Sequence, residues 1–167
     1  MNQITLTEEE CAAAQDWAAQ LKARKHARGY KDRAGVSSDD SDLIGRCGEI
    51  AVGKLLGIAP RDDLNNFTTT GDVGPYEVRT TKYPPGIAKL KIHPKDAHDR
   101  IFIGVAKCSR LEYAIIGWIR AGEAMVHSEW WADPGNIGGC WWVPQEHLHP
   151  MSTLPSLEEA TTAKGES

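Results

Sequence analysis

Residues 71–82 have the sequence GDVGPYEVRTTK, which predicts a glycine-containing turn followed by a β-strand. The turn presents one carboxylate, Asp72, and the strand begins at a second, Glu77. Along an extended strand over residues 76–81, alternation places Glu77 and Arg79 on the same face. Two acids and one cation are therefore expected to share one small patch.

Such an oxygen-rich patch suits a hard divalent cation. The carboxylates of Asp72 and Glu77, the main-chain carbonyl of Val78 and several waters would supply the near-octahedral oxygen ligands that Mg²⁺ requires. A cation two residues after the second acid can meet the charge that develops on a phosphate under attack. The pattern predicts a metal-dependent phosphodiesterase site.

Asp72 and the tripeptide Glu77-Val78-Arg79, preceded by the helical segment Gly48-Glu49-Ile50-Ala51, resemble the PD-(D/E)xK nuclease superfamily, which has the restriction-endonuclease-like fold. In that family an acid, the E-x-K tripeptide on the next strand and an upstream helical glutamate form the metal site. The resemblance implies that Mg²⁺ or Mn²⁺ is bound by Asp72, Glu77 and Val78. It also implies a catalytic set of Glu49, Asp72, Glu77 and Arg79, in which Glu49 orients the metal or a metal-bound water.

The sequence departs from the family pattern at two positions. Gly71 stands where the family has proline, and Arg79 stands where it has lysine. Arg79 keeps the positive charge and can hold a phosphate oxygen with two hydrogen bonds, but its very high pKa rules out a role as general base. Lys82 faces away from Glu77 in a regular strand. A lysine from the following strand, Lys89 or Lys91, is the alternative source of the cation.

The rest of the chain predicts an α/β domain. Thr7 and Glu10 form a capping box at the start of a helix that extends to about Gly29, and a second helix runs from about Ser41 and stops at Gly57. Three internal glycines in the second helix suggest that other backbone approaches it closely. Strands are expected at 76–81, 88–92, 100–106, 112–119 and 140–144, with a short helix within 122–131.

This element order predicts a restriction-endonuclease-like core, namely a mixed, mainly antiparallel central sheet flanked by helices. The strand at 88–92 is expected to pair with its predecessor, and the strand at 140–144 is expected to lie at an edge. A chain of 167 residues is long enough for one domain, which we place at residues 1–150. Residues 151–167 are expected to form a flexible tail.

The net charge of −4 means that any contact with nucleic acid must come from local basic patches. The candidates are Arg24, Lys25, Arg28, Lys31, Arg33, Lys82, Lys89 and Lys91. Basic residues near the end of the first helix also suit the helix dipole, which is the simpler explanation for that cluster. Five of the six tryptophans follow residue 117, and they favour a small aromatic core over a base-stacking surface.

These observations predict a metal-dependent DNA endonuclease or exonuclease. The size and layout resemble small nucleases encoded by phages. The alternative is a catalytically degenerate module of the same fold that binds nucleic acid or a protein partner. DNA is the expected partner and a homodimer is possible. With no apolar segment or leader in the sequence, we expect a cytoplasmic protein that does not contact a membrane.

Overall fold

The computed structural model describes residues 1–27, 38–62, 71–136 and 138–162. Its main sheet has the strand order β1-β5-β4-β2, formed by β1 (Asn2–Thr5), β5 (Glu112–Arg120), β4 (Ile101–Lys107) and β2 (Glu77–Thr81). β2 is parallel to β4, and the other two pairs are antiparallel. The expectation of a mixed, mainly antiparallel sheet in an α/β protein is confirmed.

β4 is the central buried strand that its continuous apolar sequence predicts. Ile101, Ile103 and Val105 pack on one face of the sheet and Phe102 packs on the other, and each is at most 2% exposed. A strand covered on both faces needs apolar side chains at successive positions, because alternation sends them to both sides.

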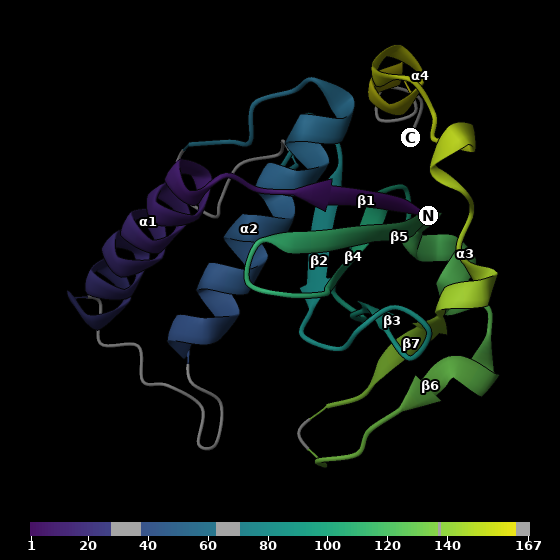
Figure 1. Ribbon diagram of the computed structural model, residues 1–167. Helices are drawn as coiled ribbons and strands as arrows, with labels where there is room; N and C mark the ends of the chain where they lie inside the picture. Colours follow the sequence, from purple (N-terminus) through teal and green to yellow (C-terminus); the bar gives the residue numbers. More distant parts are fainter. Residues whose placement is uncertain (28–37, 63–70, 137, 163–167) are drawn as a thin grey trace.

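Two long helices cover the first of these faces, and α2 lies between α1 and the main sheet (Figure 1). α1 (Glu8–Ala27) begins with the predicted capping box, in which the Thr7 N–H donates to Glu10 Oε1 at 2.8 Å and the Glu10 N–H donates to Thr7 Oγ1 at 3.0 Å. α2 (Ser38–Leu56) starts three residues earlier than predicted and stops before Gly57, whose φ is 70°.

Two glycines let α2 pack closely on its neighbours: at Gly53 the neighbour is backbone, as the sequence suggests, and at Gly48 it is a side chain. A Cβ at Gly48 would lie 1.8 Å from Thr80 Oγ1 on β2, and one at Gly53 would lie 2.5 Å from the carbonyl oxygen of Ile58. Among the described residues no atom lies within 4 Å of the Cβ position at Gly45, so the expectation finds no support there. The Gly48 contact seats α2 directly on β2.

A second, smaller sheet packs against the other face of the main sheet. Its order is β3-β7-β6, formed by β3 (Lys89–Ile92), β7 (Cys140–Pro144) and β6 (Trp131–Ala132). The two pairing predictions for these strands are wrong. β3 pairs with β7 and not with β2, and β7 is central and not an edge strand. Pro144 is compatible with this place because it ends β7.

Short helical segments follow the main sheet and the small sheet. They are α3 (Ala121–Met125) and three single-turn segments at Ser128–Trp130, Gln145–His147 and Met151–Thr153. Within the described ranges, no helix is both long and apolar enough to cross a bilayer.

The expected flexible tail from residue 151 is partly ordered, which corrects the prediction. α4 (Leu157–Thr162) buries Ala160 in the main core, and the Tyr76 hydroxyl donates to the Pro155 carbonyl at 2.6 Å. The segment is mostly polar, so its composition predicts a tail even though these few residues anchor it to the core. Positions 163–167 lie outside the described residues.

Candidate functional site

A tight turn before β2 holds Asp72. The N–H of Gly71 donates to the carbonyl of Gly74, whose φ is 58°, and Val73 and Tyr76 exchange both main-chain hydrogen bonds. A Cβ at Gly71 would lie 2.4 Å from the Tyr76 carbonyl oxygen, so any larger residue here would force the turn to shift. The turn lets Asp72 Oδ2 accept a hydrogen bond of 3.0 Å from the Val78 N–H.

Glu77 shares the start of β2 with this turn. Burial, the Asp72 charge and a hydrogen bond with Asp72 together raise the pKa of Glu77 to about 7. The Arg100 guanidinium acts in the opposite direction, because its Nη1 lies 3.3 Å from Glu77 Oε1. The structure therefore brings together the two carboxylates predicted to bind the metal.

The main chain of Val78 also faces this site. β2 is an edge strand of the main sheet, and the Val78 N–H turns to Asp72. In a strand the N–H and C=O of one residue point to the same side. The Val78 carbonyl therefore points toward the side of the strand occupied by Asp72, where the sequence predicts a third metal ligand.

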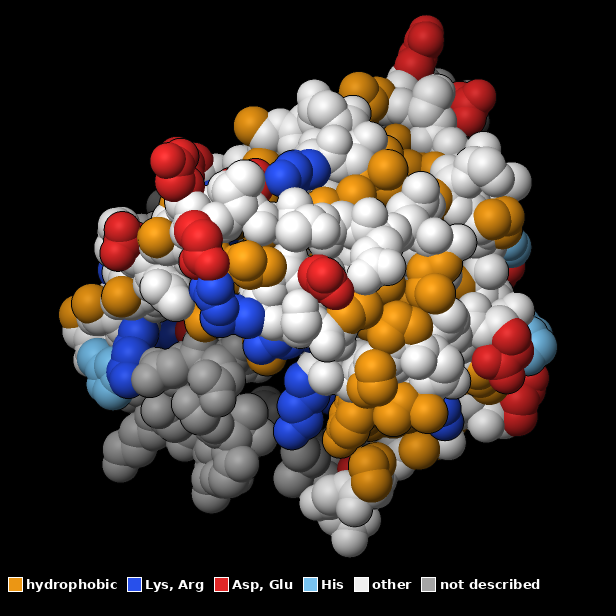
Figure 2. Space-filling model, viewed as in Figure 1, with side chains coloured by type: hydrophobic (Ala, Val, Ile, Leu, Met, Phe, Trp, Pro, Cys, Tyr) orange, Lys and Arg blue, Asp and Glu red, His pale blue; other side chains and the backbone are white. Residues whose placement is uncertain are grey.

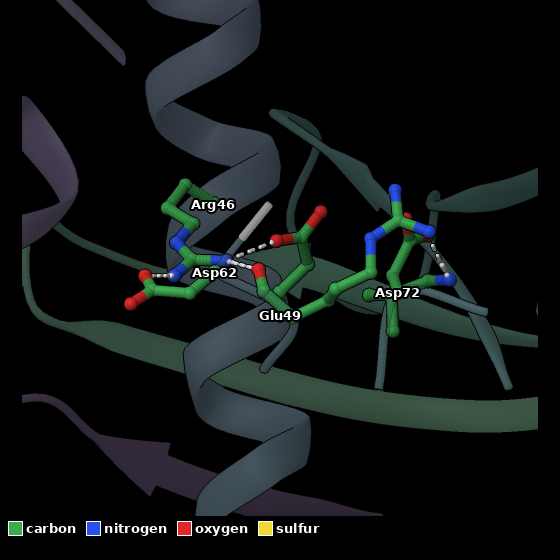
Figure 3. Close-up of polar contacts among 6 residues, drawn as sticks. Arg46, Glu49, Asp62 and Asp72 are labelled. Carbon is green, nitrogen blue, oxygen red and sulfur yellow. Dashed lines mark hydrogen bonds and ion pairs between the residues drawn. The ribbon is translucent and has the colours of Figure 1, made fainter. Parts of the chain in front are cut away.

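Glu49 lies on α2, where the contact between Gly48 and Thr80 brings the helix onto β2. Figure 3 shows Glu49 together with Asp72. The Glu49 side chain is 16% exposed. Burial and then the Asp72 charge raise the pKa of Glu49 to about 7, against the opposing effect of a hydrogen bond from Arg46. The negative charge of Asp72 thus acts on both glutamates.

Arg46 holds Glu49 in place, a role that the sequence analysis missed. Arg46 is 8% exposed, and its Nη1 donates to Glu49 Oε2 at 3.0 Å and to the Arg61 carbonyl at 2.8 Å (Figure 3). Its Nη2 lies 3.4 Å from Asp62 Oδ1, and the guanidinium carbon lies 4.8 Å from the ring centroid of Trp17. The sequence contained a signal for this contact, because residues three apart on a helix, such as Arg46 and Glu49, are neighbours that can form an ion pair.

Arg79 does not point at the carboxylates as predicted. Its guanidinium donates to both oxygens of Asp96, at 2.8 and 2.9 Å, and to the Lys91 carbonyl at 2.6 Å. It also lies over Phe102, at 4.6 Å from the ring centroid. Arg79 therefore joins β2 to β3 and the loop after it. Its charge still lowers the pKa of Glu77, but among the described residues the cation in ion-pair contact with Glu77 is Arg100.

The predicted basic residues are dispersed. Lys25 is bound to Asp42 at 3.0 Å, and Lys82 is exposed beside Tyr83. Lys89 and Lys91 are exposed on β3, and Lys91 Nζ lies over Trp142, so neither is the cation at Glu77. Arg24 is on α1. The remaining candidates, Arg28, Lys31 and Arg33, lie outside the described residues.

Within the part of the chain that the structure describes, no three His, Cys, Asp or Glu side chains are gathered closely enough to hold a metal ion by themselves. The site offers two adjacent carboxylates, a main-chain carbonyl on the same side and a third carboxylate on α2. Comparison of the chain with protein-family models, with curated proteins and with solved structures gives no match.

Proposed function

We propose that the protein is a metal-dependent DNA nuclease with a restriction-endonuclease-like arrangement of its site. The observation that carries this proposal is that the Asp72 charge acts on both Glu49 and Glu77. Burial and then the Asp72 charge raise the pKa of both glutamates to about 7. Carboxylates that repel one another in a half-buried site are stabilised by a bound divalent cation.

The donor chemistry fits Mg²⁺ or Mn²⁺. Asp72, Glu77 and the Val78 carbonyl offer only oxygen atoms, as magnesium sites do. Two carboxylates are sufficient, because Mg²⁺ in phosphoryl-transfer sites keeps several waters and takes ligands from the substrate phosphate. When bound there, the cation would neutralise the scissile phosphate and lower the pKa of a coordinated water.

The chain's own residues would handle the proton and the remaining charge. Glu49, with a pKa of about 7, is poised to accept a proton from the attacking water near neutral pH. Arg46 fixes the direction of its carboxylate through the 3.0 Å contact. Arg100, next to Glu77, is placed to bind a non-bridging phosphate oxygen through its planar guanidinium.

A second candidate function is a binding module that has lost catalysis. The engagement of Arg79 by Asp96 favours it, because the position of the family's lysine is given to a structural ion pair. On this alternative the carboxylates remain without a catalytic cation, and DNA or a protein partner would bind without being cut. Arg100 is the feature that favours the enzyme over the module.

Metal binding separates the two functions. We expect Mn²⁺ or Mg²⁺ at about 5 mM, a concentration that occupies weak sites, to raise the Tm of the protein measured by calorimetry. By mass action a ligand that binds only the folded state stabilises it. The Glu77→Gln variant should lose this rise. An equal Tm with metal and with chelator would favour the module.

A further inference from the structure

The small sheet carries a second surface, separate from the carboxylates. In β3 and β7, Leu90 lies opposite Val143 and both are buried against the main sheet. Alternation therefore turns the neighbouring pairs outward. A groove of about 360 Å³ opens there, and its lining includes Lys89, Trp130, Trp131, Trp142 and Pro144, which we call the aromatic groove.

Two lysines lie on this outward face: Lys89 lines the aromatic groove, and Lys91 lies beside it, next to Trp142. Lys89 lies opposite Pro144 and Lys91 lies opposite Trp142, and both lysines are exposed. Their places on one strand are separated by about 7 Å, which is close to the separation of successive phosphates in an extended single strand. Lys91 Nζ lies 4.4 Å from the Trp142 ring centroid, so cation and ring occupy the same part of the surface.

The lining of the groove also contains an acid, Glu129, which contacts a histidine. The ring of His127 lies 2.8 Å from its carboxylate, and hydrogen bonding by the backbone and by His127 lowers the pKa of Glu129. His127 in turn stacks on Trp130, with ring centroids 4.0 Å apart. Glu129 is thus held by His127, while Lys89 remains exposed in the groove.

The indole of Trp131 is both exposed and fixed. It is 44% exposed, although it packs edge-on against Trp141 with ring centroids 4.7 Å apart. A Cβ at Gly139 would lie 2.2 Å from the Trp131 ring, so the ring rests directly on this backbone. A flat aromatic face held in place and open to solvent is suited to stack on a nucleobase. Figure 2 shows hydrophobic side chains gathered at the small sheet, with Lys or Arg side chains at their margin.

The aromatic groove is connected to the candidate site. Arg79 on β2 donates to the main-chain carbonyl of Lys91 at 2.6 Å, which fixes β3 relative to the strand that carries Glu77. We propose that the aromatic groove binds unpaired nucleotides of a DNA strand, with indole rings on the bases and Lys89 and Lys91 on the phosphates. The proposal rests on the proposed function in one respect: the strand would belong to the DNA that the carboxylates cleave.

Binding in the presence of chelator tests the groove without catalysis. The probe is a fluorescein-labelled oligothymidine of about 12 nucleotides, within the site size of small single-strand-binding folds, and fluorescence anisotropy reports its affinity. A blunt duplex of equal length should bind more weakly. Lys89→Gln with Lys91→Gln should reduce the slope of log K against log salt by about 1.4, at about 0.7 per lost phosphate contact.

Matched variants separate charge from stacking. Lys54→Gln with Lys107→Gln removes the same charge outside the groove and should leave the slope unchanged. Trp131→Ala should weaken oligothymidine binding about fivefold or more, because fivefold is the smallest loss of affinity expected when one base loses its stacking partner. Trp131→Phe should restore most of the affinity. An abasic strand of the same length should bind wild type and Trp131→Ala equally.

Equal binding of single strand and duplex, or unchanged binding by the Lys89 and Lys91 double variant, would overturn the proposal. Glu77→Gln distinguishes it from the proposed nuclease function, because this variant should bind oligothymidine normally. A wild-type protein that binds the single strand through the groove but never cleaves DNA would refute only the nuclease. Cleavage with normal binding by the groove variants would refute only the groove.

Discussion

Arg79 and Asp96 form a two-pronged ion pair, with hydrogen bonds of 2.8 and 2.9 Å between the guanidinium and both carboxylate oxygens. Asp96 Oδ2 also accepts from the His93 N–H at 2.7 Å. The pair ties the loop after β3 to β2, so Arg79 serves the fold. Arg100, which enters from the chain before β4, is the cation that touches Glu77.

This arrangement predicts different effects for the two arginines. Asp96→Ala leaves the Arg79 charge partly buried without its partner, and we expect a loss of about 2 kcal/mol in unfolding free energy by urea denaturation. Arg79→Lys should lose stability and keep cleavage.

Arg100→Ala should keep its fold and lose at least about tenfold in cleavage rate, with partial recovery in Arg100→Lys. Equal cleavage by Arg100→Ala and wild type would remove Arg100 from the site.

The raised pKa values predict an unusual dependence of stability on pH. Glu49 and Glu77 have folded pKa values of about 7, above the ordinary carboxyl value of 4.5, so the folded state binds more protons between these limits. Their contribution is therefore fully present below pH 4.5 and is lost as the pH rises through 7. For Glu49 the loss is about 3 kcal/mol.

Urea titrations of metal-free protein at several pH values check this dependence. Glu49→Gln should flatten the decline between pH 5 and 7.5, because the amide cannot ionise. A metal that needs both carboxylates ionised should bind more tightly as the pH rises through the same window. A wild-type curve that rises with pH across the window would contradict the burial of these acids.

Arg46 offers a test of positioning. Its guanidinium opposes the rise in the pKa of Glu49, so its removal should raise that pKa further. We expect Arg46→Met, which keeps much of the buried volume, to move the acidic limb of the pH–rate profile to higher pH by about 1 unit. Lys25→Met, which removes a cation paired with Asp42, is the control. A lower rate with an unshifted profile would indicate a purely structural role for Arg46.

The glycines of α2 provide a matched pair for the seating of the helix. Gly48→Ala introduces a Cβ 1.8 Å from Thr80 Oγ1 and should destabilise the protein by about 2 kcal/mol or more. Gly45→Ala meets no atom of the described residues within 4 Å and should stabilise the protein by up to about 1 kcal/mol through helix propensity. Thermal unfolding measures both. Adding Thr80→Ala to Gly48→Ala should recover part of the loss, and a neutral Gly48→Ala would show that α2 is not seated through this contact.

Local patterns in the sequence were sufficient for the parts of the fold that depend on periodicity. The capping box of Thr7 and Glu10, the buried strand β4 and the strand that begins at Glu77 follow from neighbouring residues alone. The turn before β2 also brings Asp72 to Val78 over a short stretch of chain. These are interactions that a one-dimensional pattern can encode.

The remaining features depend on distant pairing. The contact of Arg100 with Glu77 requires the parallel register in which Glu77 lies opposite Phe102, and the engagement of Arg79 requires the loop after β3 to fold back on β2. The pairing of β3 with β7 joins segments separated by the whole of β4 and β5. Spacing rules describe residues within one helix or strand, so they do not predict contacts between distant elements.

The most direct test of the proposed site is DNA cleavage by the purified protein, followed on supercoiled plasmid and linear duplex in Mn²⁺, Mg²⁺ and chelator. Asp72→Asn keeps an oxygen to accept from the Val78 N–H while removing the shared charge. Asp62→Asn, on a side chain that is 97% exposed, is the matched control. We predict metal-dependent cutting by wild type and Asp62→Asn and at least about a hundredfold loss in Asp72→Asn. Cutting by Asp72→Asn at the wild-type rate, or none by a folded, metal-loaded wild type, would contradict the assignment.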